Sequence, residues 1–201
     1  MSKLSSIDSL PVIFEKLMTR AKILQPDLIL GDTILGLTLE ILSQHQIKGL
    51  ILDVDDTLVP LQETTVSDDL QRWVDSLRLY LPIWLVSNNL SENRIGAIAD
   101  NLQLPYLLGA VKPSRRKLRQ AMAAMGLPPQ QIAMVGDRLF TDVLAGNRLG
   151  MFTILVKPMV NPLTGGAAYP IHDFEVWISQ ILGVSLHPQH YLIKPDQSSQ
   201  K

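Results

Sequence analysis

Short apolar runs alternate with longer amphipathic segments through the middle of the chain. Five of the short runs are almost continuously apolar, which is typical of parallel strands buried on both faces. They lie at residues 49–54, 83–86, 106–110, 132–135 and 152–156. Because strand-like and helix-like segments take turns, the pattern predicts a three-layer α/β fold, with helices covering both faces of a central parallel sheet.

Polar residues indicate where the intervening helices begin. A Ser or Thr side chain can cap a helix by accepting a hydrogen bond from a free backbone N–H of the first turn. The predicted helices open at Ser67, Ser91, Ser114 and Thr141 and end near residues 80, 101, 125 and 148. Gly126 follows the third helix and is suited to a helix end.

One unusually apolar segment lies before the first predicted strand. It spans residues 28–42 and reads LILGDTILGLTLEIL. We interpret it as a helix packed on the sheet, since apolar helix faces usually pack inside a protein. The alternative is a helix that lies on the surface of a bilayer.

Length and composition fit one domain. The chain has 201 residues, 46% of them hydrophobic, and a net charge of −1. We predict a single domain over residues 1–186, including an N-terminal helical segment, and a flexible tail at residues 187–201. The small net charge argues against nucleic acid as a partner. The chain has no cysteine, which excludes disulfides and thiolate chemistry. We see no signal peptide or long apolar span and expect a cytoplasmic protein.

Candidate chemistry gathers directly after the predicted strands. In open parallel sheets, ligands bind beyond the carboxyl ends of the strands. Four such places carry polar groups: residues 53–57, residues 87–89, Lys112 and residues 136–142. Each alone has an ordinary explanation as a turn, a helix entry or an exposed lysine. Four of them in order along one predicted edge favour a functional site.

The densest of these places is DVDDT at residues 53–57. Asp53 and Asp55 share one side of an extended chain, and carboxylates so close repel each other unless a cation lies between them. Asp137 and Asp142, from GDRLFTD, bring further acids to the same edge. Mg²⁺ fits best, because it needs few carboxylates and also binds phosphate.

Two further residues complete the expected chemistry. Ser87 offers a hydroxyl and a backbone N–H to a phosphoryl oxygen, and Lys112 offers a fixed positive charge. With the cation, these groups predict a phosphoryl-transfer site, in which positioning and charge stabilisation provide most of the catalysis.

The same motifs resemble those of the haloacid dehalogenase (HAD) superfamily. DVDDT looks like the first motif, SNN at residues 87–89 the second, Lys112 in AVKP the third and GDRLFTD the fourth, in the right order. A closer likeness, carried by LQPDLIL, HQIKGLILDVDDTLVP and GDRLFTDVLAGNRLGMFTILVKP, is to subfamily IIIA phosphatases of the YqeG type. Phosphatidylglycerophosphate phosphatases look like relatives of that group. Many members carry Asn where this chain has Asp56.

The resemblance implies a role for each motif residue. Asp53 would attack phosphorus and become an aspartyl phosphate, while Asp55 would protonate the leaving oxygen and then activate water. Ser87 and Lys112 would act on the transferring phosphoryl group. The implied Mg²⁺ ligands are Asp53, Asp55 through its backbone carbonyl, Asp137 and Asp142. The implied substrate-binding residues are Thr57, Asn88 and Asn89.

The resemblance also bears on the substrate. Family members that act on small metabolites often carry a cap domain after the first motif or between the second and third. The gaps at residues 57–83 and 89–106 are too short for one, so we expect a capless, open site. An open site suits a phosphorylated lipid head group, a macromolecule or a lid from another subunit. We interpret the basic sequence SRRKLR at residues 114–119 as a solvated helix face; the alternative is a cluster that attracts anionic lipid and so favours peripheral membrane contact.

Three other functions stay open. One is a phosphatase for a soluble sugar or nucleotide phosphate. Another is a phospho-receiver domain, which needs an acidic pair at an earlier strand end; Asp27 and Asp32 instead lie in a helix-like context. The last is an inactive HAD scaffold used for binding, against which the retention of both Asp53 and Asp55 argues.

Overall fold

The computed structural model describes residues 22–159. The predicted limits of the domain at residues 1–186, its N-terminal helical segment before residue 22 and the tail at residues 187–201 lie outside the described residues.

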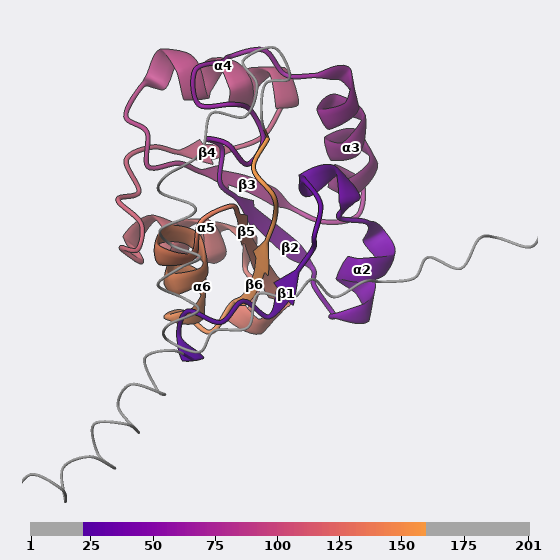
Figure 1. Cartoon of the computed structure of the whole chain (residues 1–201), viewed down its shortest axis with the longest axis vertical. Helices are drawn as coiled ribbons and strands as arrows, with labels where there is room; N and C mark the ends of the chain where they lie inside the picture. Colours follow the sequence, from indigo (N-terminus) through magenta and orange to yellow (C-terminus); the bar gives the residue numbers. More distant parts are fainter. Residues whose placement is uncertain (1–21, 160–201) are drawn as a thin grey trace, which may run out of the picture.

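A single parallel sheet of six strands forms the centre of the fold (Figure 1). Its spatial order is β1-β6-β5-β2-β3-β4, and every neighbouring pair is parallel. The strands are β1 (Leu28–Ile29), β2 (Gly49–Leu52), β3 (Ile83–Val86), β4 (Tyr106–Leu107), β5 (Ile132–Gly136) and β6 (Phe152–Leu155). The predicted parallel sheet is confirmed, with β2 and β5 at its centre.

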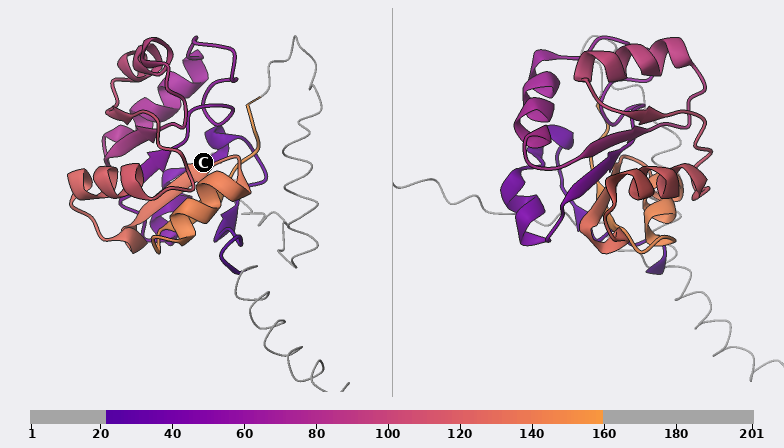
Figure 2. Two further views of the ribbon diagram at one scale, coloured as in Figure 1. Left: turned by 90° about the vertical axis from the view of Figure 1, so that its left-hand side faces the viewer. Right: turned by 180° about the vertical axis from the view of Figure 1, so that it is seen from behind.

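Helices cover both faces of this sheet (Figures 1 and 2). The helical elements are η1 (Ile34–Gly36), α2 (Leu39–Gln44), α3 (Asp68–Arg78), α4 (Glu92–Leu102), α5 (Arg116–Met125), η2 (Pro129–Gln131), η3 (Leu139–Val143) and α6 (Leu144–Asn147). Alternate residues of β2 enter different cores: Leu50 and Leu52 pack with α2, α3 and α4, whereas Ile51 packs with α5 and α6. The predicted three layers follow from this alternation.

The predicted helix starts are right for two helices and wrong for two. Ser67 and Ser91 cap α3 and α4, since their hydroxyls accept hydrogen bonds from Leu70 N and Arg94 N. Ser114 does not cap α5; its N–H donates to Val111 O in the preceding turn, and the helix starts at Arg116. The predicted start at Thr141 is also late, because the wide π-type turn η3 begins at Leu139.

The prediction of one helix over residues 28–42 is wrong. The segment divides into β1, η1 and the start of α2, and Gly31, in the left-handed region at φ 72°, directly follows the strand region. Asp27 lies before β1 rather than in a helix, and its carboxylate accepts hydrogen bonds from the N–H and hydroxyl of Thr153 on β6. The segment does pack inside, as expected: Leu28, Ile34 and Leu42 are buried.

The strand predicted at 106–110 stops at Leu107. Gly109 turns the chain at φ 55°, and Ala110 N donates to Ser87 O. This turn leads the chain back across the end of β3, which brings Lys112 toward β2. Between β2 and β3, and again between β3 and β4, the only helices are α3 and α4, so the fold is capless as predicted.

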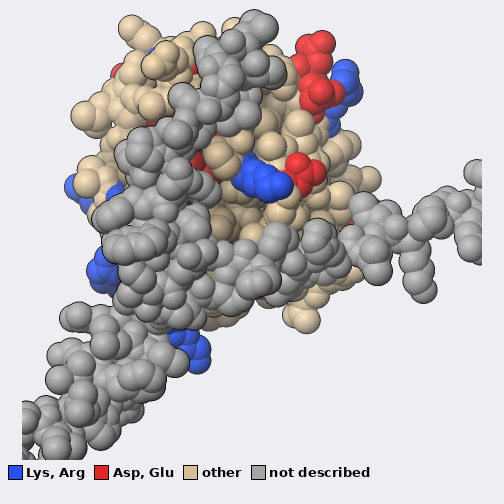
Figure 3. All heavy atoms as spheres, in the orientation of Figure 1, with Lys and Arg blue, Asp and Glu red and all other residues tan. Residues whose placement is uncertain are grey.

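Two surface properties bear on possible partners. Among residues 22–159, no helix combines the length and apolar character needed to cross a bilayer. The face drawn in Figure 3 carries scattered Lys and Arg side chains, without a continuous basic surface among its described atoms. The scattered charge agrees with the small net charge of the chain.

Candidate active site

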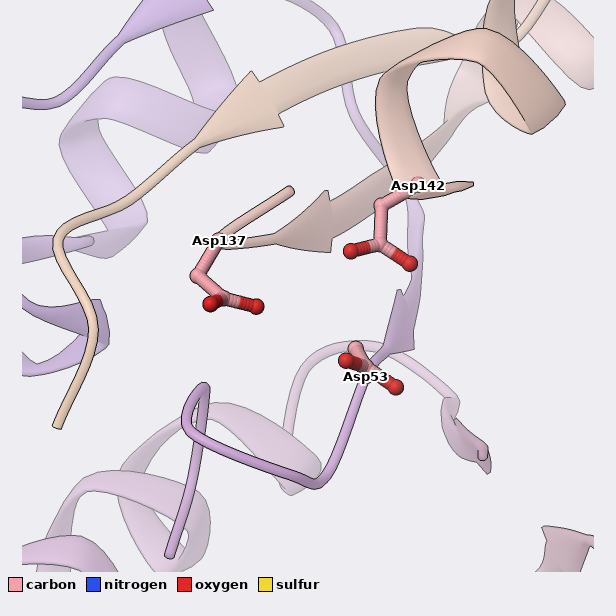
Figure 4. A group of neighbouring side chains, drawn as sticks. All are labelled: Asp53, Asp137 and Asp142. Carbon is pink, nitrogen blue, oxygen red and sulfur yellow. The ribbon is translucent and has the colours of Figure 1, made fainter. Parts of the chain in front are cut away.

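Three buried aspartates meet at the carboxyl edge of the central strands (Figure 4). Asp53 follows β2, Asp137 follows β5 and Asp142 lies on η3. One carboxylate oxygen from each lies within 4.8 Å of the others. The register of the sheet explains this meeting: Leu52 is level with Val135, and Asp53 N donates to Val135 O.

Lys112 inserts its ammonium between two of these acids. Its Nζ lies 2.5 Å from Asp53 Oδ1 and 2.7 Å from Asp142 Oδ1, and the side chain is buried. Burial alone would lower the pKa of Lys112, but Asp142 and Asp53 raise it above its ordinary value. Lys112 is therefore a permanent positive charge in the site.

One ammonium does not neutralise three carboxylates. Burial raises the pKa of Asp53 to about 7, opposed by Lys112 and reinforced by Asp142. Burial, with Asp142 and Asp53 nearby, raises the pKa of Asp137 to about 8. Asp142 Oδ2 is buried without a hydrogen-bond partner among the described residues. Buried carboxylate oxygens whose charge is not balanced fit a hard divalent cation.

Gly136 makes room for this arrangement. A Cβ at this position would lie 2.3 Å from Asp142 Oδ2 and 2.6 Å from Asp142 Cβ. Real Cβ atoms do not come so close, so any side chain at residue 136 would displace the Asp142 carboxylate. Gly136 thus allows the Asp142 side chain to pack closely against the backbone. The two aspartates of the same motif, Asp137 and Asp142, face the same space (Figure 4).

The Asp55 side chain lies apart from the three buried acids and pairs with Arg94 of α4. Its other oxygen accepts hydrogen bonds from Ser87 Oγ at 3.3 Å and Asn89 Nδ2 at 3.4 Å. Arg94 also donates to the backbone oxygens of Glu63 and Pro60. The guanidinium thus connects the loop after β2 to the first turn of α4, and it orients Asp55. Sequence reasoning missed Arg94; the available signal was a cation in the first turn after SNN.

The remaining predicted residues build the walls of the site. Asn88 and Lys112 join the loops after β3 and β4, since Lys112 N donates to Asn88 Oδ1 at 2.6 Å. Thr57 Oγ1 donates to Asp137 Oδ1 at 3.2 Å, which places the hydroxyl beside the acidic cluster. Asp56 closes the turn after β2: it adopts φ 59°, and its carboxylate accepts from Leu61 N at 2.9 Å.

This geometry defines a class of site: a carboxylate nucleophile candidate beside a fixed ammonium and a cation-binding group of acids. Residues 110–161 match the family described as HAD-hydrolase-like, and residues 9–102 match the family described as mitochondrial PGP phosphatase. The two matches meet at the site, because the first two motifs lie in one and the last two in the other.

Curated relatives agree with this class. The chain is 34% identical over 129 residues to the probable phosphatase YqeG of Bacillus subtilis (strain 168), covering 64% of this chain and 74% of that protein. It is 28% identical over 160 residues to the chloroplastic phosphatidylglycerophosphate phosphatase 1 of Chlamydomonas reinhardtii, covering 74% of this chain and 59% of that protein. A third relative, 32% identical over 72 residues, is the dihydroxyacetone phosphatase of Corynebacterium glutamicum (strain R), with 36% of this chain and 26% of that protein covered.

The chain therefore belongs to the HAD-type phosphatases of the YqeG kind, which are phosphoric monoester hydrolases. It spans less than two thirds of the length of the chloroplastic relative.

Gly136→Ala is expected to lower phosphatase activity by about 100-fold or more, because displacing Asp142 misplaces a charged group of the site. The measurement is kcat/KM on a soluble phosphate ester, with circular dichroism to verify folding. Gly36→Ala is the matched control: its Cβ would lie 3.0 Å from the carboxylate of Asp32, but that side chain is exposed and can move. Equal activity of Gly136→Ala and wild type would contradict the packing argument.

The raised pKa values predict an unusual pH dependence of stability. Between the ordinary pKa of 3.8 and the raised values of about 7 and about 8, the folded chain binds more protons than the unfolded chain. Stability without a divalent cation should therefore fall as pH rises from about 5 to about 8. Bound Mg²⁺ should suppress the fall, because it neutralises the ionised acids.

Melting temperatures measured with EDTA and with Mg²⁺ across this range test the prediction. Asp75→Asn, which removes a half-buried acid paired with Arg78 on α3, should leave the pH dependence unchanged. A melting temperature that rises with pH in EDTA would contradict the raised pKa values, and one that does not respond to Mg²⁺ would contradict a cation site.

Proposed function

We propose that this phosphatase hydrolyses a phosphomonoester through an aspartyl phosphate on Asp53, with Mg²⁺ as cofactor. The single observation that carries the proposal is the buried Asp53 carboxylate, with Lys112 Nζ 2.5 Å from one of its oxygens and two more acids around it. A buried nucleophile with one oxygen fixed by an ammonium presents its other oxygen in a defined direction.

The proposed reaction has two displacements. An oxygen of Asp53 forms a bond to phosphorus while the bond to the leaving oxygen breaks, and Asp55 gives that oxygen a proton. Asp55 then takes a proton from water, whose oxygen attacks the aspartyl phosphate and releases inorganic phosphate, restoring Asp53. Two easier displacements replace one difficult step. Arg94 holds Asp55 beside Ser87 and Asn89 for both proton transfers.

The metal role rests on the same acids. Asp53, Asp137 and Asp142, with the backbone carbonyl of Asp55, would hold Mg²⁺. When bound, Mg²⁺ supplies positive charge that offsets the repulsion between a carboxylate nucleophile and an anionic phosphate. Lys112 and Ser87 bind the transferring phosphoryl group, and Asn88 fixes the loop that carries Lys112. Asn89 fixes Ser87 and Asp55, since Asn89 N donates to Ser87 Oγ.

The proposed substrate is a phosphorylated lipid head group, phosphatidylglycerophosphate in the first instance. Support comes from the match to the mitochondrial PGP phosphatase family, the chloroplastic relative and the capless site. Peripheral contact with a membrane from the cytoplasm would follow from such a substrate.

A soluble phosphoester is the second candidate, favoured by the similarity to dihydroxyacetone phosphatase. A phospho-receiver domain is disfavoured. Of the described residues near the end of β1, Asp32 is a lone exposed acid, whereas a receiver needs an acidic pair.

Two isosteric variants test the covalent route with p-nitrophenyl phosphate, whose leaving group needs no proton. Asp53→Asn should lose turnover by about a thousandfold or more and form no phosphoenzyme. Asp55→Asn should release one burst of nitrophenol and then stall, because water is no longer activated. Quenched-flow measurement and acid-stable labelling separate the two outcomes. Normal turnover by Asp53→Asn would eliminate the assigned nucleophile.

Initial rates on phosphatidylglycerophosphate vesicles and on a panel of soluble sugar and nucleotide phosphates decide the substrate class. We expect kcat/KM to be at least about tenfold higher on the lipid, since binding energy from a cognate substrate is used at the transition state. The Asp53→Asn protein is the control for contaminating phosphatase. A soluble ester that exceeds the lipid would replace it as the substrate, without affecting the mechanism.

A further inference from the structure

Three exposed apolar side chains surround the active site, one from each of three loops. Among the described residues, the exposed large hydrophobics at the carboxyl edge of the sheet are Leu61, Leu90 and Val111, with 53%, 80% and 69% of their surfaces accessible. They follow β2, β3 and β4, respectively. We call these three residues the apolar rim.

Contacts between the loops fix the positions of the residues of the apolar rim. The loop that carries Leu61 is held to α4 by Arg94, which donates to the oxygens of Pro60 and Glu63. Leu90 lies just before α4 and against the next loop, since a Cβ on Gly109 would be 2.7 Å from Leu90 Cδ2. Val111 follows two residues later, directly before Lys112. The three side chains therefore border the site on consecutive loops.

Val111 is held in an unfavourable backbone conformation. Its φ of 50° lies in the left-handed region, which β-branched residues rarely adopt. Glycine or asparagine would fit this turn without strain, and an exposed valine adds nothing to the core. Strained backbone often occurs next to functional sites. The side chain held there presents an apolar surface to solvent.

A basic cluster lies beside the apolar rim, at the start of α5. Its members are Arg115, Arg116, Lys117 and Arg119. Ser114 N donates to Val111 O, so the turn from the rim leads directly into this cluster. Cations in a first helical turn oppose the helix dipole, and the first turn of α5 contains no acid to offset them. The exposed acid Glu92 lies instead in the first turn of α4, after Leu90.

We propose that the apolar rim and the basic cluster dock the active site onto an anionic lipid bilayer, with the three apolar side chains inserted among the lipids. Apolar tips flanked by cations match the two layers of such a surface, acyl chains beneath anionic head groups. Docking would also exclude water from the capless site. The inference rests on the proposed function, because it presumes a substrate held in that bilayer.

Vesicle binding without turnover tests the docking surface. The full chain carrying Asp53→Asn is sedimented with vesicles of phosphatidylcholine alone, or of phosphatidylcholine mixed equally with phosphatidylglycerol. Combining Leu61→Ser, Leu90→Ser and Val111→Asn should weaken binding to the mixed vesicles by about tenfold or more. Asn is chosen at residue 111 because it tolerates positive φ. Arg116→Gln with Arg119→Gln should remove the preference for the anionic vesicles.

The matched control is at the opposite edge of the sheet. Leu79 and Tyr80 are exposed to a similar degree, 78% and 71%, but follow α3 where the chain enters β3. Leu79→Ser with Tyr80→Ser should leave vesicle binding unchanged. The same rim substitutions are then made in the active chain, which retains Asp53. There they should keep kcat/KM on p-nitrophenyl phosphate within about twofold of wild type and lose activity only on lipid in vesicles.

Four outcomes overturn the docking proposal. The first is that the rim variants bind vesicles as well as the Asp53→Asn chain does. The second is that the Leu79 and Tyr80 variants lose as much binding as the rim variants. The third is that the Asp53→Asn chain itself does not bind vesicles. A rim variant that changes only the oligomeric state, measured by sedimentation velocity, would assign the surface to a second copy of the chain. If the chain that retains Asp53 has no phosphatase activity, the proposed function is refuted instead, while the measured binding to vesicles still stands.

Discussion

The confinement of three aspartate carboxylates with one lysine ammonium in a buried site is the constraint on which the rest of this structure depends. Like charges repel strongly where water is excluded, and within residues 22–159 Lys112 forms ion pairs with Asp53 and Asp142 but not with Asp137. Burial, reinforced by the neighbouring carboxylates, raises the pKa values of Asp53 and Asp137. A bound divalent cation would complete the balance of charge.

Several distant features serve this confinement. Parallel pairing of β2 and β5 places Asp53 and Asp137 at the same edge. The tight approach to Gly136 admits Asp142 from η3, and the wide turn of η3 points its carboxylate back toward the strand end. Gly109 reverses the chain after β4, which delivers Lys112. In each case the backbone conformation brings a side chain from a separate segment into the same small volume.

Sequence predicted the features that depend on local pattern. Continuous apolar runs marked the strands from β2 onward, and motif spacing named all four members of the charged cluster. β1 was missed because it lies inside a longer apolar segment that we interpreted as a helix, and because its partner β6 lies over a hundred residues away. Arg94 was missed for a similar reason: its pairing with Asp55 depends on how α4 meets the loop after β2. Non-local packing, rather than propensity, decides such positions.

Environment separates the two acids that the sequence places two residues apart. Asp53 is buried against the ammonium of Lys112, which suits the proposed nucleophile. Asp55 is half-buried and bound by Arg94, Ser87 and Asn89, which suits the proposed proton donor and acceptor. Paired carboxylates acquire different roles when their surroundings differ. Asp53 and Asp55 can therefore follow β2 so closely because each carboxylate has its own partners. Of these two acids, Asp53 belongs to the buried cluster with Asp137 and Asp142.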